Sequence, residues 1–350
     1  MTTNAQASTS TAALPVYAKK DFESGVDPRW CPGCGDFSII NQVQRTLPSV
    51  GVKRENIVFV SGIGCSSRFP YYMNTYGMHT LHGRAPAFAS GIKVSRPELM
   101  VWVITGDGDA LAIGGNHFIH AMRRNLDLKI LMFNNRIYGL TKGQVSPTSE
   151  LGKKTKTTPH GSPDYPFNPP ALALGAGATF VARTIDIEGA HMGGVLKAAA
   201  EHKGSAYVEI FQNCPVFNDG AYAAITEKAV KVDAQLRMEH GKPLLFGKDS
   251  KKGIRFNPQT AELEVVTLGE GGVTEKDILV HDVKREDPTI AFMLANLALK
   301  PGFPTPIGVF RDVVKPTADE ITWELIEKAK AKGAGDLKAF LAGGDTWKIG

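Results

Sequence analysis

Short apolar segments of strand length recur along the first two thirds of the chain. They lie at 57–61, 100–105, 129–134, 179–183 and 206–211. Between these segments the apolar residues recur every three or four positions, which is typical of amphipathic helices. The clearest helical segments are 36–47, 110–125 and 187–203. Because strands alternate with helices, we predict an α/β fold with a doubly wound, mainly parallel sheet.

Two segments depart from this alternation. Residues 140–172 are rich in Gly, Pro, Ser, Thr and Lys without clear periodicity, and a loop of this length between regular elements is usually functional. Beyond residue 230 the chain mixes charged residues with short apolar pieces, among them a possible hairpin strand and the helical stretch 287–300. We therefore expect a disordered or extended tail at 1–20, a main domain at 21–230, and an irregular C-terminal extension at 231–350 that packs on this domain or on a partner subunit.

Composition narrows the class of protein. The chain has 350 residues, of which 43% are hydrophobic and 21% charged, enough for one large α/β domain with additions. It contains no run of about 18 apolar residues, and its start lacks the basic and apolar segments of a secretory signal. The net charge of +5 comes from scattered residues. We expect a cytoplasmic protein that binds neither membranes nor nucleic acid.

Polar motifs follow two of the predicted strands. Gly106, Asp107 and Gly108 end one strand, and Asn134 and Asn135 end the next. If the two strands are parallel neighbours, their carboxyl ends open into one crevice, where α/β sheets bind ligands. A carboxylate and an amide oxygen can hold Mg²⁺, and the glycines allow the backbone to turn sharply beside phosphates. Together the motifs predict thiamine diphosphate bound through Mg²⁺, with Asp107 and Asn135 as ligands.

The four cysteines indicate which kind of thiamine protein this is. They are Cys31 and Cys34 in a CxxC pair, then Cys65, then Cys214, which precedes Pro215. A CxxC pair places two thiolates on one turn around a metal or cluster, and a Cys-Pro pair ends some cluster motifs. Structural zinc more often uses two CxxC pairs, although a zinc site or unrelated buried thiols remain alternatives. We favour one 4Fe-4S cluster with all four cysteines as ligands.

Thiamine beside a cluster has a chemical meaning. Thiamine accepts the electrons left when a 2-oxoacid loses carbon dioxide, and a cluster can pass these electrons singly to a low-potential carrier such as ferredoxin. Coenzyme A would collect the acyl group. A thiamine decarboxylase without redox chemistry would leave the cysteines unexplained, whereas a zinc-stabilised binding module or a small electron-transfer protein would leave the strand-end motifs unexplained.

Six stretches carry a resemblance to a known family. They are RWCPGCGDFSI, SGIGCSSRFPYY, LHGRAPAFASGIK, ITGDGDALAIGGNH, NNRIYGLTKGQ and NCPVFND. In this order they resemble the beta subunit of the 2-oxoacid:ferredoxin oxidoreductases, over residues 20 to 230 and most closely in the 2-oxoglutarate branch. The resemblance implies a thiamine-diphosphate-binding fold, Mg²⁺ held by Asp107, Asn135 and the carbonyl of Ile137, and a 4Fe-4S cluster on the four cysteines.

The resemblance also implies partners. A larger alpha subunit would complete the site, in a heterodimer or a dimer of heterodimers, so the chain alone would show no turnover. The complex would convert 2-oxoglutarate and coenzyme A to succinyl-coenzyme A and carbon dioxide, reduce ferredoxin, and run in reverse if the ferredoxin is sufficiently reduced. The alternatives within the family act on pyruvate or on branched-chain 2-oxoacids.

Several residues beside the motifs are candidates for substrate and cofactor binding. Lys142 and Arg68 could each pair with the distal carboxylate of 2-oxoglutarate, a contact that contributes about 1.5 to 3 kcal/mol. The alternatives are a solvated loop lysine for Lys142, and diphosphate neutralisation or a salt bridge with the partner chain for Arg68. His82 is the best acid-base or polarising candidate, because imidazole can donate to the substrate carboxylate or carbonyl oxygen at neutral pH; the alternative is a histidine that only fixes a loop by hydrogen bonds. The further residues expected around the cofactor are Gly64, Ser66, Asp109, Leu140 and Thr141.

Overall fold

The computed structural model describes residues 15–344, 347 and 349, so that most of the predicted tail, residues 1–14, lies outside the described residues. The first described element is a 3-10 helix, Lys19–Phe22, which packs through the fully buried Phe22. Within the described residues, no helix has both the length and the apolar character needed to cross a lipid bilayer.

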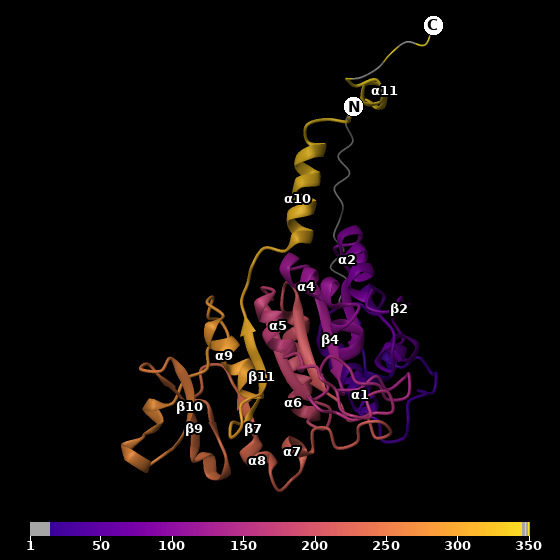
Figure 1. Cartoon of the computed structure of the whole chain (residues 1–350). Helices are drawn as coiled ribbons and strands as arrows, with labels where there is room; N and C mark the ends of the chain where they lie inside the picture. The colour runs from indigo at the N-terminus through magenta and orange to yellow at the C-terminus, as the bar shows by residue number, and fades with distance from the viewer. Residues whose placement is uncertain (1–14, 345–346, 348, 350) are drawn as a thin grey trace.

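An eight-stranded sheet forms the centre of the molecule (Figure 1). From one edge to the other its strands are β2 (Tyr76–His79), β1 (Ile57–Ser61), β3 (Met100–Gly106), β4 (Leu128–Asn134), β6 (Ala206–Phe211), β5 (Phe180–Ile185), β11 (Thr305–Asp312) and β7 (Gln235–Met238). All neighbouring strands are parallel except β5 and β11. The predicted mainly parallel sheet is confirmed, and the five predicted strands agree with β1, β3, β4, β5 and β6.

Helices cover both faces of the sheet. On one face lie α1 (Asp36–Thr46) and α6 (Gly189–Glu201), and on the other lie α2 (Ala85–Ser95), α4 (Gly115–Arg124), α5 (Pro169–Gly175) and α9 (Thr289–Leu297). Successive residues of β3 serve the two cores, since Val101 and Val103 pack under α2 and α4 whereas Trp102 and Ile104 pack under α1 and α6. A strand with apolar residues on both faces explains the continuous apolar run in the sequence.

The helix predicted at 110–125 is instead two helices, α3 (Asp107–Leu111) and α4, with a break at 112–114. The loop at Gly83 crosses the chain at this break. A Cβ atom on Gly83 would lie 2.5 Å from the amide nitrogen of Gly114, and one on Gly114 would lie 2.3 Å from the carbonyl oxygen of Asp109. The break is therefore a close crossing of two backbones, which helical periodicity alone does not predict.

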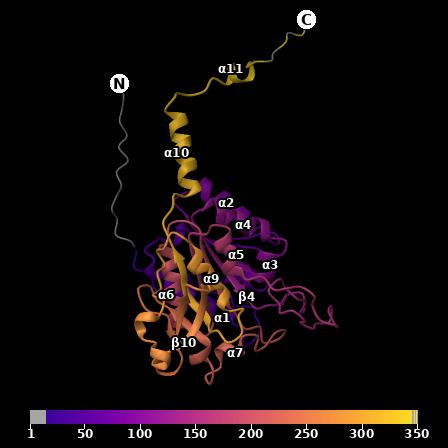
Figure 2. The same ribbon diagram turned by 60° about the vertical axis from the view of Figure 1, so that its left-hand side comes forward.

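The segment after residue 230 contributes strands to the main sheet as well as peripheral structure. β7 and β11 belong to that sheet, so the predicted division at 230 does not coincide with its edge. The short helix α7 (Ala223–Thr226) precedes this segment. The segment also contains the short helix α8 (Lys231–Ala234), a small antiparallel sheet of β8 (Leu245–Phe246), β9 (Lys252–Asn257) and β10 (Glu262–Thr267), and the helices α10 (Ala318–Lys330) and α11 (Leu337–Leu341). Figures 1 and 2 show α10 and α11 extending away from the body of the molecule.

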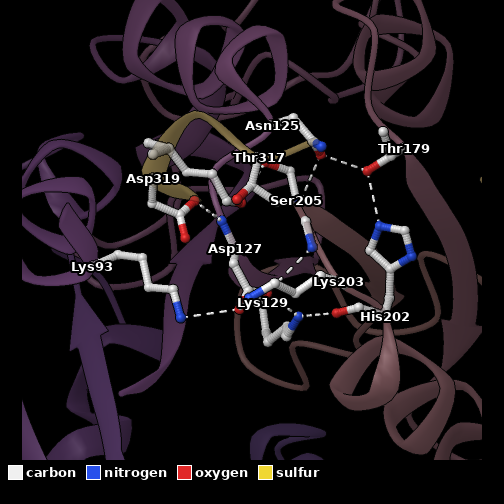
Figure 3. Close-up of polar contacts among 12 residues, drawn as sticks. Lys93, Asn125, Asp127, Lys129, Thr179, His202, Lys203, Ser205, Thr317 and Asp319 are labelled. Atoms are coloured by element: carbon white, nitrogen blue, oxygen red, sulfur yellow. Dashed lines mark hydrogen bonds and ion pairs between the residues drawn. The ribbon is translucent and has the colours of Figure 1, made fainter. Parts of the chain in front are cut away.

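A buried polar network lies at the amino ends of β4, β5 and β6 (Figure 3). Asp127 accepts hydrogen bonds from two buried lysines, at 2.7 Å from Lys129 and 3.0 Å from Lys93. Nearby, Thr179 donates to Asn125 over 2.7 Å. These contacts join the loops that precede three strands, so they fix the amino ends of these strands relative to one another.

The same network ties down the segment that leads to α10. The side-chain amide of Asn125 donates to the carbonyl oxygens of Lys315 and Pro316, and the backbone N–H of Asp127 donates to Asp319 over 3.1 Å. α10 thus begins from a fixed point at the amino edge of the sheet. The opposite, carboxyl edge carries the polar motifs predicted from the sequence.

Candidate active site

The carboxyl ends of β1, β3 and β4 surround a cavity of about 110 Å³. Among its lining residues are the predicted Gly64, Ser66, His82, Gly106, Asp107, Gly108, Asp109, Asn135, Ile137, Leu140 and Thr141. We call this space the diphosphate cavity. It brings together residues from four separate loops because parallel strands end at the same edge of the sheet.

Asp107 is buried at the start of α3, directly after β3. Its Oδ2 atom accepts hydrogen bonds from Ser146, at 2.5 Å, and from Thr148, at 2.6 Å. Both of these side-chain hydrogen bonds end on Oδ2. Burial raises the pKa of Asp107 although the two hydroxyl groups act to lower it. A bound cation would therefore stabilise the carboxylate.

The turn after β4 presents the other predicted metal ligands. Arg136 has a φ of 57°, in the left-handed region that residues other than glycine rarely adopt. This turn places Asn135 and Ile137 on the same cavity, and Asn135 is held by a 2.9 Å hydrogen bond to Gln212. Backbone strain of this kind persists only where surrounding contacts maintain it. Three potential oxygen ligands thus border one space.

Asp109 connects three segments of the site. Its Oδ1 atom accepts hydrogen bonds from the ring Nδ1 of His82, at 2.6 Å, and from the backbone N–H groups of Gly83 and Ile63, at 2.6 and 3.1 Å. Its Oδ2 atom accepts a hydrogen bond from Thr105 over 2.6 Å. Although Asp109 borders the cavity, its oxygens already bond to protein, and the structure gives it a positioning role. With Nδ1 of His82 bonded to Asp109, the other ring nitrogen remains for a ligand.

The four cysteines line a second cavity of about 200 Å³, which we call the cysteine cavity. Cys31 and Cys34 precede α1, Cys65 follows β1, and Cys214 follows β6. All four are free thiols. A Cβ atom on Gly139 would lie 3.7 Å from the sulfur of Cys65 and 3.6 Å from that of Cys214, so these two thiols face the same point of the loop.

The two cavities adjoin, because Cys65, Asn135, Gly139 and Leu140 line both of them. Burial, together with the nearby Asp36, raises the pKa of Cys65 to about 11, and the same causes raise the pKa of Cys34. A bound metal would favour the thiolate form of both side chains. In the described part of the chain, no three His, Cys, Asp or Glu side chains are grouped to hold a single metal ion.

Lys142 and Arg68 line the cysteine cavity and not the diphosphate cavity. Arg68 donates to the carbonyl oxygen of Arg29 over 3.0 Å, and Lys142 has a φ of 76° in the loop after Leu140. Both cations thus lie beside the cysteines, next to the shared wall of the two cavities. The structure separates them from His82, which borders the diphosphate cavity.

Four site residues carried no signal that we used in the sequence. Ser146 and Thr148 come from the long loop that we predicted to be functional, and Tyr138 donates to the carbonyl oxygen of Gly108 over 2.9 Å. Asp36 is fully buried on the wall of the diphosphate cavity, and burial together with the like charge of Asp186 raises its pKa to about 7. An aspartate in the first turn of a helix is so common that Asp36 resembles an ordinary helix start.

Comparison with known proteins supports a thiamine diphosphate site in this chain. Residues 62–210 match the family described as thiamine pyrophosphate enzyme, C-terminal TPP binding domain. The 2-oxoglutarate oxidoreductase subunit KorB of Mycobacterium tuberculosis is 50% identical over 336 residues, which cover 94% of this chain and 88% of that protein. The 2-oxoglutarate synthase subunit KorB of Methanocaldococcus jannaschii is 46% identical over 188 residues, covering 54% of this chain and 70% of its own length.

A solved structure is similar over nearly the whole fold. The 2-oxoglutarate:ferredoxin oxidoreductase of Magnetococcus marinus, with 2-oxoglutarate, coenzyme A and succinyl-CoA bound, superposes with a TM-score of 0.74 at 34% sequence identity. The match covers 94% of this chain and 97% of that one. The thiamine-binding fold, the strand-end motifs and these relatives together show that the chain belongs to the beta subunits of the 2-oxoacid:ferredoxin oxidoreductases, in the 2-oxoglutarate branch.

Proposed function

We propose that the chain, together with an alpha subunit, converts 2-oxoglutarate and coenzyme A to succinyl-coenzyme A and carbon dioxide and passes the electrons to ferredoxin. The observation that carries this proposal is the shared wall of the two cavities. Asn135, a predicted metal ligand, and Cys65, a predicted cluster ligand, both lie on that wall. Electrons released at the first cavity would have a short path to the second.

The diphosphate cavity fits Mg²⁺ and thiamine diphosphate. Asp107 offers a carboxylate oxygen, Asn135 its amide oxygen and Ile137 its carbonyl, all oxygen ligands of the kind that Mg²⁺ prefers. Gly64 has a φ of 135° with open space around it, which leaves room for a diphosphate beside the backbone. When bound, thiamine diphosphate would supply the carbon nucleophile for the 2-oxo group and hold the electrons left by decarboxylation.

The cysteine cavity fits a 4Fe-4S cluster. Four thiols surround a space of about 200 Å³, which suits a cluster with four corners. A single zinc ion would instead draw all four sulfurs to within about 2.3 Å of one point. Cys31 is exposed whereas Cys214 is buried, so the cluster would have one edge toward solvent or a partner and one edge toward the interior. That exposed edge is a suitable exit for electrons.

The roles of His82, Lys142 and Arg68 are part of the same proposal. His82, held by Asp109, would donate from its free ring nitrogen to the 2-oxo carboxylate or carbonyl oxygen. Lys142 and Arg68 would pair with the distal carboxylate of 2-oxoglutarate across the shared wall. The contacts made by His82 and by the two cations would also act in the reverse, reductive reaction. In that reaction the same site would bind succinyl-coenzyme A and carbon dioxide.

The first experiment is coenzyme A-dependent reduction of a viologen dye by the anaerobically purified alpha–beta complex. Parallel assays would offer 2-oxoglutarate, pyruvate and 2-oxoisovalerate, and the purified single chain is expected to show no turnover. A preference for 2-oxoglutarate supports the proposal. Preference for another acid would overturn the roles of Lys142 and Arg68, and turnover without any dye reduction would indicate a thiamine enzyme without redox chemistry.

A further inference from the structure

The first asparagine of the strand-end pair has no role in the function described above. Asn134 is the last residue of β4 and its side chain is buried, away from the diphosphate cavity. Its amide nitrogen donates to Oε1 of Glu209 over 2.7 Å, and its amide oxygen accepts from the backbone N–H of Arg136 over 3.2 Å. The same oxygen lies 2.9 Å from the hydroxyl of Thr148.

Both ends of this contact chain are anchored. Glu209 on β6 pairs with Arg183 on β5 over 2.6 Å, and their side chains are 1% and 2% exposed. The guanidinium of Arg183 also lies 5.0 Å from the ring centre of Phe211. At the other end, the hydroxyl of Thr148 lies 2.6 Å from Oδ2 of Asp107. Arg183, Glu209, Asn134 and Thr148 thus form one polar chain that ends on the predicted metal ligand.

The chemistry of each group sets the direction of the next. A carboxylate only accepts hydrogen bonds, so Glu209 requires the NH₂ group of Asn134 to face it. The amide oxygen must then face Arg136 and Thr148. Thr148 carries a single hydroxyl proton, which it shares between two acceptors, the nearer and charged Oδ2 of Asp107 at 2.6 Å and the amide oxygen of Asn134 at 2.9 Å. Thr148 is thereby held against Oδ2 of Asp107, a residue that lines the diphosphate cavity.

We propose that Arg183, Glu209, Asn134 and Thr148 are positioning residues that hold Asp107 in place to bind the metal. This inference rests on the proposed Mg²⁺ site and extends it to residues that touch neither metal nor diphosphate. Outer hydrogen-bond partners of metal ligands commonly control affinity, and their loss typically costs about 10- to 100-fold in binding. The two residues of the strand-end pair would therefore serve the same metal site, because Asn135 binds the metal and Asn134 orients the other ligand, Asp107.

Asn134→Ala is the central test, because it interrupts the chain while leaving the Arg183–Glu209 pair in place. All four positioning residues line a third cavity of about 320 Å³, so water can enter the space that the shorter side chain leaves. The metal-free alpha–beta complex would be titrated with Mg²⁺ in excess thiamine diphosphate and followed by calorimetry. We expect the dissociation constant of Mg²⁺ to rise about 10- to 100-fold.

Two further variants examine the last link. Thr148→Val removes the hydroxyl at nearly constant volume and should weaken Mg²⁺ binding as Asn134→Ala does, whereas Thr148→Ser keeps the hydroxyl and should bind close to wild type. Thr179→Ala is the matched control, because Thr179 is equally buried but bonds within the network at the opposite edge of the sheet. It should lower the melting temperature without changing Mg²⁺ affinity.

The outcomes separate this inference from the proposed function. If the wild-type complex binds Mg²⁺ but Asn134→Ala and Thr148→Val bind it equally well, the positioning role is wrong and the polar chain only stabilises the fold. If Thr179→Ala weakens binding as much as Asn134→Ala, the effect is a general loss of stability and the inference also fails. A wild-type complex that binds no Mg²⁺ with thiamine diphosphate would overturn the proposed cofactor site and the inference together.

Discussion

Replacement of Asp127 by asparagine should destabilise the folded chain, because it removes the negative charge between two buried lysines. Asp127 lies 2.7 Å from Lys129 and 3.0 Å from Lys93, and the side chains of both lysines are only 3% exposed. Burial alone would raise the pKa of Asp127, but the two lysines outweigh it and hold this pKa well below its usual range. Burial lowers the pKa of Lys129, and the charge of Asp127 opposes this shift.

The magnitude follows from what the variant leaves behind. Asparagine keeps the volume and one acceptor, but the two ammonium groups would retain mainly carbonyl partners in a dry site. Breaking a buried ion pair from one side costs about 3–5 kcal/mol. For a chain of this size that corresponds to a fall in melting temperature of about 4–7 °C.

Thermal unfolding of the alpha–beta complex, measured by calorimetry, would test this value. Lys203→Ala is the matched control, since Lys203 also contacts Asp127, at 3.4 Å, but is 49% exposed. An exposed pair contributes less than about 1 kcal/mol, so this control should melt close to wild type. If Asp127→Asn lowers the melting temperature no more than Lys203→Ala, the reasoning that buried charge decides the stability of this edge is refuted.

The pH dependence gives the prediction a sign. Because the pKa of Asp127 is lowered on folding, its stabilisation is complete above the unfolded value of about 4 and is lost as the pH falls below it. The difference in melting temperature between wild type and Asp127→Asn should therefore be constant from pH 7 to about 5 and shrink at lower pH. A difference that grew on acidification would contradict this sign.

Three further predictions concern the site. Cys214→Ser should lower the iron and acid-labile sulfide content of the complex and abolish dye reduction while thiamine diphosphate still binds, and retention of the wild-type iron content would argue against Cys214 as a ligand. Lys142→Ala should raise the KM for 2-oxoglutarate about 10- to 100-fold and leave pyruvate use unchanged, whereas an equal loss on both acids would remove its distal-carboxylate role. Asp109→Asn should lower kcat about 10- to 100-fold by releasing His82, and unchanged kcat would mean that His82 needs no such partner.

The local part of the fold could be predicted from the sequence because local patterns encode it. Buried parallel strands are apolar on both faces, so β1, β3, β4, β5 and β6 were visible as continuous apolar runs. β11 was not visible, because its sequence contains Pro306 and Gly308, which usually argue against a strand. Gly308 is required there, since a Cβ atom would lie 2.6 Å from the carbonyl oxygen of Met238 in the neighbouring strand.

The site divides in the same way. Asp107, Asn135 and the four cysteines belong to short motifs, and the structure gathers them at one edge because parallel strands end together. Lys142 also lies beside a motif, yet which of the two cavities it borders depends on the left-handed turn at that residue. The sequence thus predicted that Lys142 lies near the cofactor motifs, but not that it lines the cysteine cavity.

By itself the sequence determined the class of sheet, the strand ends that carry the polar motifs, and the family. Only the tertiary structure decided how these groups are held, as in the contact between Asn134 and Glu209, which are 75 residues apart. The same is true of the hydroxyl that Thr148 presents to Asp107 from a loop without periodicity. The physical reason is that secondary structure and binding motifs depend on neighbours within a few positions, whereas the partners of a buried polar group depend on which distant strands and loops pack together.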